Sequence, residues 1–197
     1  MHDIDVRAEL HNRLHMTHRR ELETTMFVDE LAIVGRARVD TAVLNGSFSG
    51  YEIKSERDNL ARFPNQVQMY STVLDYCHLV TTPRHLEHAA EFLPDWWGVI
   101  IATESEERVL LKRARAPRLN RVIDPWFLSR LLWRDEVLDA LEKRQLSTGI
   151  RSRPNAVLWD RLATSVSRRT LRTIVRESLK SRSGWRAGVP RSSSGAA

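Results

Sequence analysis

The sequence predicts an α/β fold in which a central mixed sheet is flanked by helices and followed by an all-helical C-terminal extension. The first supporting observation is a pair of strand-like segments, residues 38–44 and 49–54, on either side of Asn45-Gly46, a dipeptide typical of hairpin turns. The second is the alternation of helical and strand patterns over residues 63–115. The third is that only helical patterns occur between residues 124 and 186.

These patterns divide the chain into three parts. We expect a core at residues 1–120, a basic helical extension at 121–186 and a disordered tail at 187–197, where small residues dominate. With 197 residues, of which 42% are hydrophobic, the chain can bury one sizeable core with a smaller appendage.

The elements before the hairpin are a helical region and a strand. Val6, Leu10 and Leu14 recur at a spacing of four within residues 3–24, which predicts a helix whose apolar stripe packs on a sheet. Residues 26–34 follow as an apolar segment that is interrupted by two acidic residues.

The hairpin carries Asp40, Glu52 and Lys54. Because side chains alternate between faces along a strand, Glu52 and Lys54 share one face, while Ile53 points to the other face and into apolar packing. An acidic and a basic side chain therefore lie together on one side of the sheet.

The face of Asp40 depends on the length of the hairpin loop. A two-residue turn at Asn45-Gly46 would set Asp40 on the face away from Glu52. A three-residue loop at 44–46, with its glycine in the left-handed region, would place Asp40 opposite Gly50 and diagonal to Glu52. We expect the three-residue loop.

An aspartate, a glutamate and a lysine on one face are suited to metal-assisted hydrolysis of phosphodiesters. Carboxylates are the hard ligands that Mg²⁺ prefers, and this ion keeps some water and bridges to substrate phosphate. The ammonium of Lys54 can orient the attacking water or offset developing negative charge. We therefore expect Asp40 and Glu52 to bind Mg²⁺, for which Mn²⁺ would substitute, and all three side chains to be catalytic.

The order Asp40, eleven residues, then Glu-Ile-Lys resembles the PD-(D/E)XK nuclease superfamily, with Val39 in place of the proline of that motif. The resemblance implies a restriction-endonuclease-like core. It also implies a catalytic role for Glu30, because many members carry an extra upstream glutamate; pairing with Arg36 or Arg38 is the alternative for this carboxylate. We expect Arg38 to contact the substrate.

A helix should begin at Pro64, whose fixed φ suits a first helical turn. Gln66 and Tyr70 lie one turn apart on a single face of this helix. Their spacing resembles a motif of exonuclease-like branches of the same superfamily, which implies that both contact the substrate backbone or the metal-bound water. Arg62, just before the helix, is expected to join them.

The following segments complete the sheet. Residues 77–82 predict a strand, 83–95 a helix, and 96–103 and 107–114 two further strands. A strand, a helix and a strand in this order imply parallel pairing within the sheet.

Four segments together resemble the sce-type family, small bacterial and phage proteins assigned to the PD-(D/E)XK fold. They are GYEIKS, the spacing R-x-P-x-Q-x-x-x-Y from Arg62 to Tyr70, LPDWWGVI and SLKSRSGWR. The likeness covers residues 26–186. It implies a fold and a nuclease activity but no particular substrate, and it associates the chain with phages or mobile elements.

The C-terminal helices start at Asp124-Pro125, an N-cap followed by proline at the first helical position. The last two helices flank a tight turn capped by Ser167, and the second presents arginines that we expect to bind nucleic acid. A helix-turn-helix and an ordinary helical hairpin with a solvated basic face both fit this pattern. The arginines are Arg168, Arg169 and Arg172.

The net charge of +6 is unevenly distributed. Residues 143–197 hold 13 Lys and Arg against two acids, a net charge of +11, which leaves −5 for residues 1–142. A cationic C-terminal segment beside an acidic remainder of the chain favours nucleic acid as the partner. With Cys77 as the only cysteine and no segment apolar enough to span a bilayer, we expect a cytoplasmic protein without a membrane partner.

Two functions fit the sequence. The first is a Mg²⁺-dependent nuclease, with DNA favoured over RNA as substrate. The second is a non-catalytic nucleic-acid-binding accessory protein that uses the basic C-terminal helices. An intact set of Asp40, Glu52 and Lys54 favours the nuclease, because a binding protein has no need to gather three costly charges. The sequence leaves open whether the protein is a monomer or a homodimer.

Overall fold

A computed structural model describes residues 2–56, 58–105 and 108–182, so the tail predicted at 187–197 lies outside the described residues. Its centre is a six-stranded mixed sheet in which the strands lie in their sequence order. The strands are β1 Met26–Ile33, β2 Ala37–Leu44, β3 Phe48–Lys54, β4 Tyr76–Thr81, β5 Gly98–Glu104 and β6 Val109–Arg115. β3, β4 and β5 pair in parallel, and the other neighbouring pairs are antiparallel. The expected central mixed sheet is confirmed.

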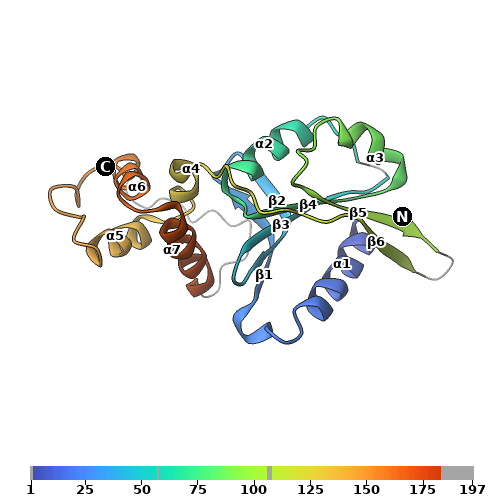
Figure 1. Cartoon of the computed structure of the whole chain (residues 1–197), viewed down its shortest axis with the longest axis horizontal. Helices are drawn as coiled ribbons and strands as arrows, with labels where there is room; N and C mark the ends of the chain where they lie inside the picture. Colours follow the sequence, from blue (N-terminus) through green and yellow to red (C-terminus); the bar gives the residue numbers. More distant parts are fainter. Residues whose placement is uncertain (1, 57, 106–107, 183–197) are drawn as a thin grey trace.

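The helices cover both faces of this sheet and one of its ends. They are α1 Asp3–Thr17, the short 3₁₀ helix η1 Leu22–Thr24, α2 Phe63–Val73, α3 Pro83–Ala90, α4 Pro125–Ser129, α5 Arg134–Glu142, α6 Asn155–Ser165 and α7 Arg168–Ser181. α1 lies on one side of the sheet, α2 and α3 lie on the other, and α4 to α7 gather at one end of the molecule (Figure 1). None of the helices in the described ranges has the length and apolar character needed to cross a membrane.

The first helix packs as its stripe predicts. Val6, Leu10 and Leu14 are buried and form a cluster with Tyr51 and Ile53 of β3. Ile53 therefore points to the α1 face, which leaves its neighbours Glu52 and Lys54 on the α2 face.

A larger core fills the α2 face of the sheet and continues into the C-terminal helices. Tyr70 of α2, Leu128 of α4, Leu158 of α6 and Leu171 of α7 belong to one cluster of buried side chains. The helices beyond residue 120 therefore share their apolar core with the sheet.

The hairpin has the expected three-residue loop, but at a different position. Leu44 pairs with Phe48 and Thr41 with Tyr51, so the loop is Asn45-Gly46-Ser47 rather than residues 44–46. This register brings Asp40 to the level of Glu52 rather than Gly50. Asp40 and Glu52 line the same cleft. Strict alternation does not extend to Asp40, because its neighbour Val39 packs in the core of the α2 face while Asp40 bonds Arg7 of α1. The expected left-handed conformation of the loop glycine is wrong, since the glycines with positive φ among the described residues are Gly35 and Gly149.

Two arginines attach α7 to the base of the sheet. Arg172 Nε lies 3.0 Å from Asp75 Oδ1, and Arg176 Nη1 lies 3.6 Å from Asp75 Oδ2. The same aspartate accepts a hydrogen bond from Phe48 N at 2.8 Å, and its side chain is only 4% exposed. The prediction that Arg172 binds nucleic acid is therefore wrong, because this guanidinium is used to fix α7 to the core. Ser167 caps α7 by accepting a bond from Thr170 N, as predicted.

Candidate active site

A cleft of about 970 Å³ opens where β2, β3 and the first turn of α2 meet. It brings together six of the residues that the sequence analysis selected. They are Arg38, Asp40, Glu52, Lys54, Arg62 and Gln66. The cleft thus collects carboxylates, an amine, an amide and two guanidinium groups from three elements that are separated in the sequence.

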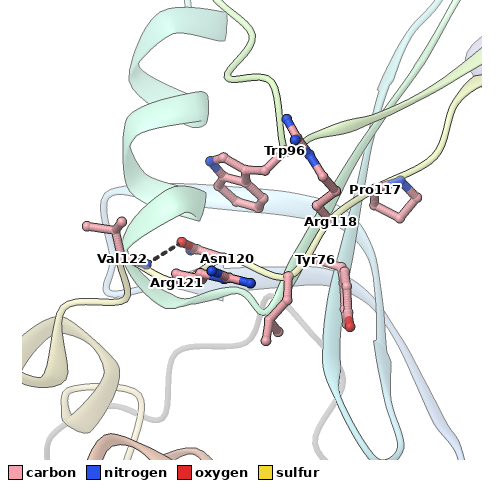
Figure 2. A pocket seen from close by; sticks show the side chains of 8 residues that line it. Tyr76, Trp96, Pro117, Arg118, Asn120, Arg121 and Val122 are labelled. Carbon is pink, nitrogen blue, oxygen red and sulfur yellow. Dashed lines mark hydrogen bonds between the residues drawn. The ribbon is translucent and has the colours of Figure 1, made fainter.

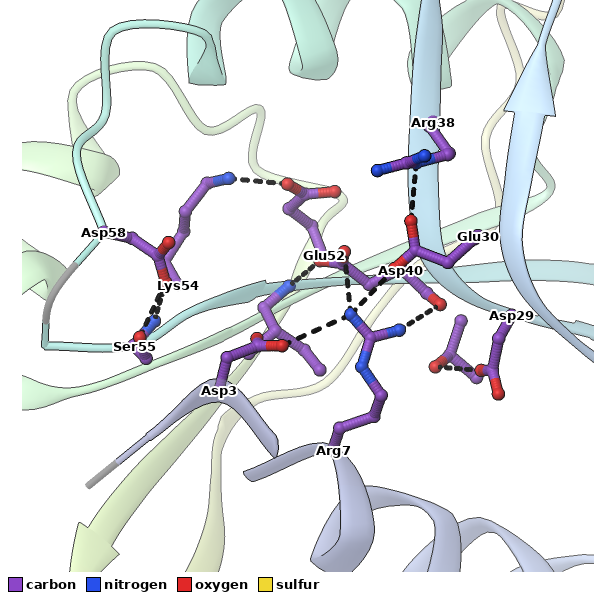
Figure 3. Close-up of polar contacts among 12 residues, drawn as sticks. Asp3, Arg7, Asp29, Glu30, Arg38, Asp40, Glu52, Lys54, Ser55 and Asp58 are labelled. Carbon is purple, nitrogen blue, oxygen red and sulfur yellow. Dashed lines mark hydrogen bonds and ion pairs between the residues drawn. The ribbon is translucent and has the colours of Figure 1, made fainter. Parts of the chain in front are cut away.

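Glu52 is the most deeply buried acid of the cleft, with 2% of its surface exposed. Its Oε1 accepts hydrogen bonds from Lys54 Nζ at 2.6 Å and from Gln66 Nε2 at 2.5 Å. Its Oε2 accepts one from Tyr70 Oη at 2.7 Å. Three donors from β3 and α2 therefore fix the orientation of this carboxylate. A dashed line joins the Lys54 and Glu52 side chains in the upper left part of Figure 3.

Burial and, to a smaller extent, the nearby charge of Asp40 raise the pKa of Glu52 to about 7, although Lys54 and Tyr70 favour its charged form. Burial also raises the pKa of Asp40, although the N–H of Ile53 and the guanidinium of Arg7 favour its charged form. Two carboxylates that are desolvated and repel each other stabilise any cation that binds between them.

The protein without divalent cations is expected to lose stability as the pH rises through the range from 4.5 to about 7. The folded state holds a proton on Glu52 in this range, whereas an unfolded chain with a glutamate pKa of 4.5 has released it. Protonation of Glu52 therefore contributes about 3 kcal/mol to the free energy of unfolding below pH 4.5. This contribution is lost as the pH rises to the pKa of Glu52 in the folded protein.

Urea unfolding in EDTA at pH 5 and pH 8 measures this effect. Glu52→Gln should flatten the pH dependence relative to wild type, because glutamine does not titrate. Adding Mg²⁺ at pH 8 should restore stability to the wild type and not to Glu52→Gln. Identical pH profiles for the two proteins would contradict the raised pKa.

Asp40 sits where the hydrogen-bonded pairing of β2 with β3 has ended. The last paired residues before the cleft are Thr41 and Tyr51, which leaves the N–H of Ile53 without a partner on β2. Asp40 Oδ2 accepts this bond at 2.7 Å, and its Oδ1 lies 3.2 Å from Arg7 Nη2. The divergence of the two strands thus creates room for the cleft and positions the aspartate at its edge.

Arg7 of α1 is a site residue that sequence reasoning missed. Its Nη2 lies 2.9 Å from Glu30 Oε1 and 3.4 Å from Asp3 Oδ2, in addition to its contact with Asp40 (Figure 3). It also donates to the Asp40 backbone carbonyl at 2.8 Å. No local pattern relates Arg7 to a residue 33 positions away, so only the packing of α1 on the sheet reveals it.

Glu30 is placed beside the cleft by an unusual backbone. It has φ of 55°, a left-handed conformation that is costly for a residue with a Cβ. Its Oε2 lies 2.5 Å from Arg38 Nε, which is the alternative pairing that the sequence allowed. Glu30 does not belong to the described lining of the cleft. Its catalytic role stays a prediction, and any such role would be exerted through Arg7 and Arg38, with which it pairs.

The other predicted substrate contacts lie in different places. Tyr70 is 1% exposed and lies behind Glu52, and its hydroxyl oxygen is also within hydrogen-bond distance of the Arg38 carbonyl, which competes with Glu52 for the single phenol proton. This burial argues against contact with the substrate backbone, whereas the expected contact with the metal-bound water stays a prediction. In the structure Tyr70 positions Glu52. Arg168 and Arg169 are exposed on the first turn of α7, outside the lining of the cleft.

The carboxylate oxygens of the cleft could still bind a divalent cation. Both oxygens of Asp40 and Oε2 of Glu52 each accept a single hydrogen bond, so each retains a free lone pair. The buried Oε1 of Gln66 has no hydrogen-bond partner among the described residues. Within that same part of the chain, no three His, Cys, Asp or Glu side chains are grouped as a metal-binding cluster. A cation would therefore be held by two carboxylates, water and substrate, which is the usual manner for Mg²⁺.

Comparison with known proteins relates the chain to a phage protein. The family described as Bacteriophage P4 protein cII matches residues 2–187. Protein cII of enterobacteria phage P4 is 22% identical over 162 residues, which cover 82% of this chain and 61% of that protein. The chain thus spans about three fifths of this relative's length.

Among solved structures, the SPO1766 protein of unknown function from Silicibacter pomeroyi aligns with 68% of this chain and 86% of its own. The identity is 19% and the TM-score is 0.39, a likeness too low to carry an argument.

Proposed function

We propose that this chain, which belongs to the Bacteriophage P4 protein cII family, is a divalent-cation-dependent nuclease that hydrolyses phosphodiester bonds, with DNA favoured over RNA. The match to the family and to the phage protein supports the expected phage association. The proposed activity is argued from the cleft, because the chain covers only 61% of the phage protein.

One observation carries the proposal: Asp40, Glu52 and Lys54 come from two strands and line the same cleft. Gathering a buried lysine and two acids in one place is energetically costly, so such groups mark functional sites more often than structural ones. The hairpin followed by two parallel strands, with helices on both faces, also supports our proposal of a restriction-endonuclease-like core.

Mg²⁺ or Mn²⁺, when bound, would supply a Lewis acid that activates water and neutralises charge on the scissile phosphate. Asp40 and Glu52 would hold the cation. Lys54 places an ammonium in a pocket where little solvent screens its charge, so it can stabilise negative charge that grows on the phosphate during attack.

The remaining polar groups of the cleft bind and orient the substrate. The unpaired Gln66 Oε1 can accept a hydrogen bond from the attacking water or from a hydroxyl of the substrate. Arg62 and Arg38 are exposed at the rim, where they can contact phosphates on either side of the reacting one. Tyr70 and Arg7 hold the two carboxylates in place.

The test is cleavage of labelled linear, circular and single-stranded nucleic acid with Mg²⁺, with Mn²⁺ or with EDTA. Asp40→Asn and Glu52→Gln should raise the Mg²⁺ concentration required for half-maximal cleavage and lower the rate, because each removes a charged ligand. Asp29→Asn, which changes an exposed acid outside the cleft lining, is the matched control and should behave as wild type.

The absence of cleavage of every substrate form by the wild type, with both metals, would overturn the proposal. If cleavage persists in EDTA, or if both cleft variants cleave as wild type, the cation bound by Asp40 and Glu52 has no part in the reaction. In the first case the non-catalytic nucleic-acid-binding protein becomes the working description of the chain.

A further inference from the structure

A second hollow, of about 610 Å³, lies at the other end of α2 from the cleft. It is formed by the first residue of β4, the turn before β5 and the segment that leads from β6 to α4. Tyr76, Trp96, Leu119 and Val122 supply apolar and aromatic surface, and Arg118 and Arg121 supply charge. Figure 2 shows these side chains around the hollow.

The apolar walls of this hollow face solvent. Val122 is 83% exposed and Leu119 is 44% exposed, whereas Trp96 and Tyr76 are half-buried. Exposed apolar surface beside an aromatic ring marks a place where a flat or apolar group binds.

The backbone under the hollow is held rigidly. Asn120 is 2% exposed and donates to the carbonyls of Ser71 and Leu74 at the end of α2, at 2.8 and 3.0 Å. Arg118 N donates to the Trp96 carbonyl at 2.8 Å. The side chains around the hollow are therefore presented from a fixed frame, which lowers the entropic cost of binding a ligand.

The chain segment that ends at the hollow is rich in positive charge. Residues 108–121 contain six basic residues and no acid. Arg115 is used internally, since its Nε donates to the Trp97 carbonyl at 2.7 Å. The other five are exposed: Arg108, Lys112, Arg113, Arg118 and Arg121. Arg118 and Arg121 form no ion pair with any acid in the described part of the chain, so their charges are available to an anion.

We propose that this hollow binds single-stranded nucleic acid, with a base against Trp96 and the neighbouring phosphates on Arg118 and Arg121. A polyanion complements the charge, and an unpaired base complements the aromatic and aliphatic walls. A duplex keeps its bases stacked inside and would present only phosphates, leaving the apolar walls uncovered. This site is separate from the cleft and does not require that the cleft hydrolyse anything.

The two sites are about one helix apart. α2 has eleven residues, and its first turn lines the cleft while its last turn supports the hollow. At 1.5 Å per residue this is about 16 Å, the span of roughly five stacked nucleotides. One strand of modest length can therefore reach both sites.

Binding of fluorescein-labelled oligothymidylate, titrated in EDTA at several salt concentrations, tests the proposal. Replacing both Arg118 and Arg121 with alanine should weaken binding and reduce the logarithmic salt slope by about 1.4, because each phosphate contact on single strands contributes about 0.7. Trp96→Leu should weaken binding about tenfold while leaving the salt slope unchanged, because it removes a stacking surface and no charge.

The matched control replaces Arg19 and Arg20, an exposed pair that follows α1, with alanine. The proposal fails if the control weakens binding as much as the Arg118 and Arg121 variant, or if that variant binds as wild type while keeping its melting temperature. It also fails if a polyglutamate peptide binds as tightly and depends equally on Trp96, because the site would then take acidic protein segments. Because EDTA prevents cation-dependent cleavage, this outcome is independent of the outcome of the cleavage assay.

Discussion

Replacing Lys54 with alanine is expected to lower the rate of cleavage by about a hundredfold or more while leaving nucleic-acid affinity nearly unchanged. The side chain is 10% exposed, lies 2.6 Å from Glu52 and lines the cleft. An ammonium in this position acts mainly on charge that develops during attack on phosphorus, so its loss is felt in the transition state and little in the bound ground state. Single-turnover rates and binding in EDTA measure the two effects separately.

Two further variants sharpen this experiment. Lys54→Arg should not rescue the rate, because a planar guanidinium cannot occupy the place of a compact ammonium. Lys143→Ala removes the same charge from a lysine whose side chain is 68% exposed and should cleave as wild type. A Lys54→Ala protein that cleaves at the wild-type rate would exclude the lysine from catalysis, whatever its effect on stability.

Replacing Asp75 with alanine should cost about 3–5 kcal/mol of unfolding free energy, the largest stability effect that we expect of a single substitution. The buried carboxylate pairs with Arg172 and Arg176 and caps the N–H of Phe48. Its removal leaves two largely buried guanidinium groups and a backbone donor uncompensated. Guanidinium chloride unfolding monitored by circular dichroism gives the value.

Asp139→Ala is the control for this substitution. Asp139 pairs with Lys143 at 2.7 Å, but the two side chains are 58% and 68% exposed. An exposed pair one turn apart on a helix contributes about 0.3–0.5 kcal/mol, so the control should be nearly neutral. An Asp75→Ala protein within 1 kcal/mol of wild type would show that α7 is held by its apolar contacts alone.

The faces of Glu52, Ile53 and Lys54 could be predicted because side chains alternate along a strand. The odd loop brings Asp40 to the level of Glu52, but alternation does not extend to Asp40, since Val39 packs in the core of the α2 face and Asp40 bonds Arg7 of α1. The position of the loop could not be predicted in the same way. It is fixed by Asn45, whose side chain accepts bonds from the N–H and the hydroxyl of Ser47, and such local competition is invisible to a hydrophobic pattern.

The roles of individual polar residues were harder to predict than their faces. Tyr70 shares a helical face with Gln66, but how deeply each is buried depends on how α2 packs on the sheet. Arg172 follows the buried Leu171 in α7, so it borders the apolar stripe and meets Asp75 instead of a ligand. The charge count predicted a cationic surface for residues 143–197, whereas part of that charge neutralises Asp75, a buried acid of the core.

The basic residues of segment 108–121 did not stand out in the charge pattern, because residues 1–142 as a whole are net acidic. A net charge summed over 142 residues does not reveal a short basic segment when the acids that balance it lie elsewhere in the sequence.

The odd loop of the hairpin also constrains how relatives of this chain can diverge. Inserting or deleting one residue between Leu44 and Phe48 would reverse the orientation of every side chain of one strand relative to the other, and would separate Asp40 from Glu52. A change of two residues would preserve the relative orientation of the side chains of the two strands. Functional descendants should therefore accumulate length differences in this loop in steps of two, and lineages that depart from this rule should be those that have abandoned the chemistry of the cleft.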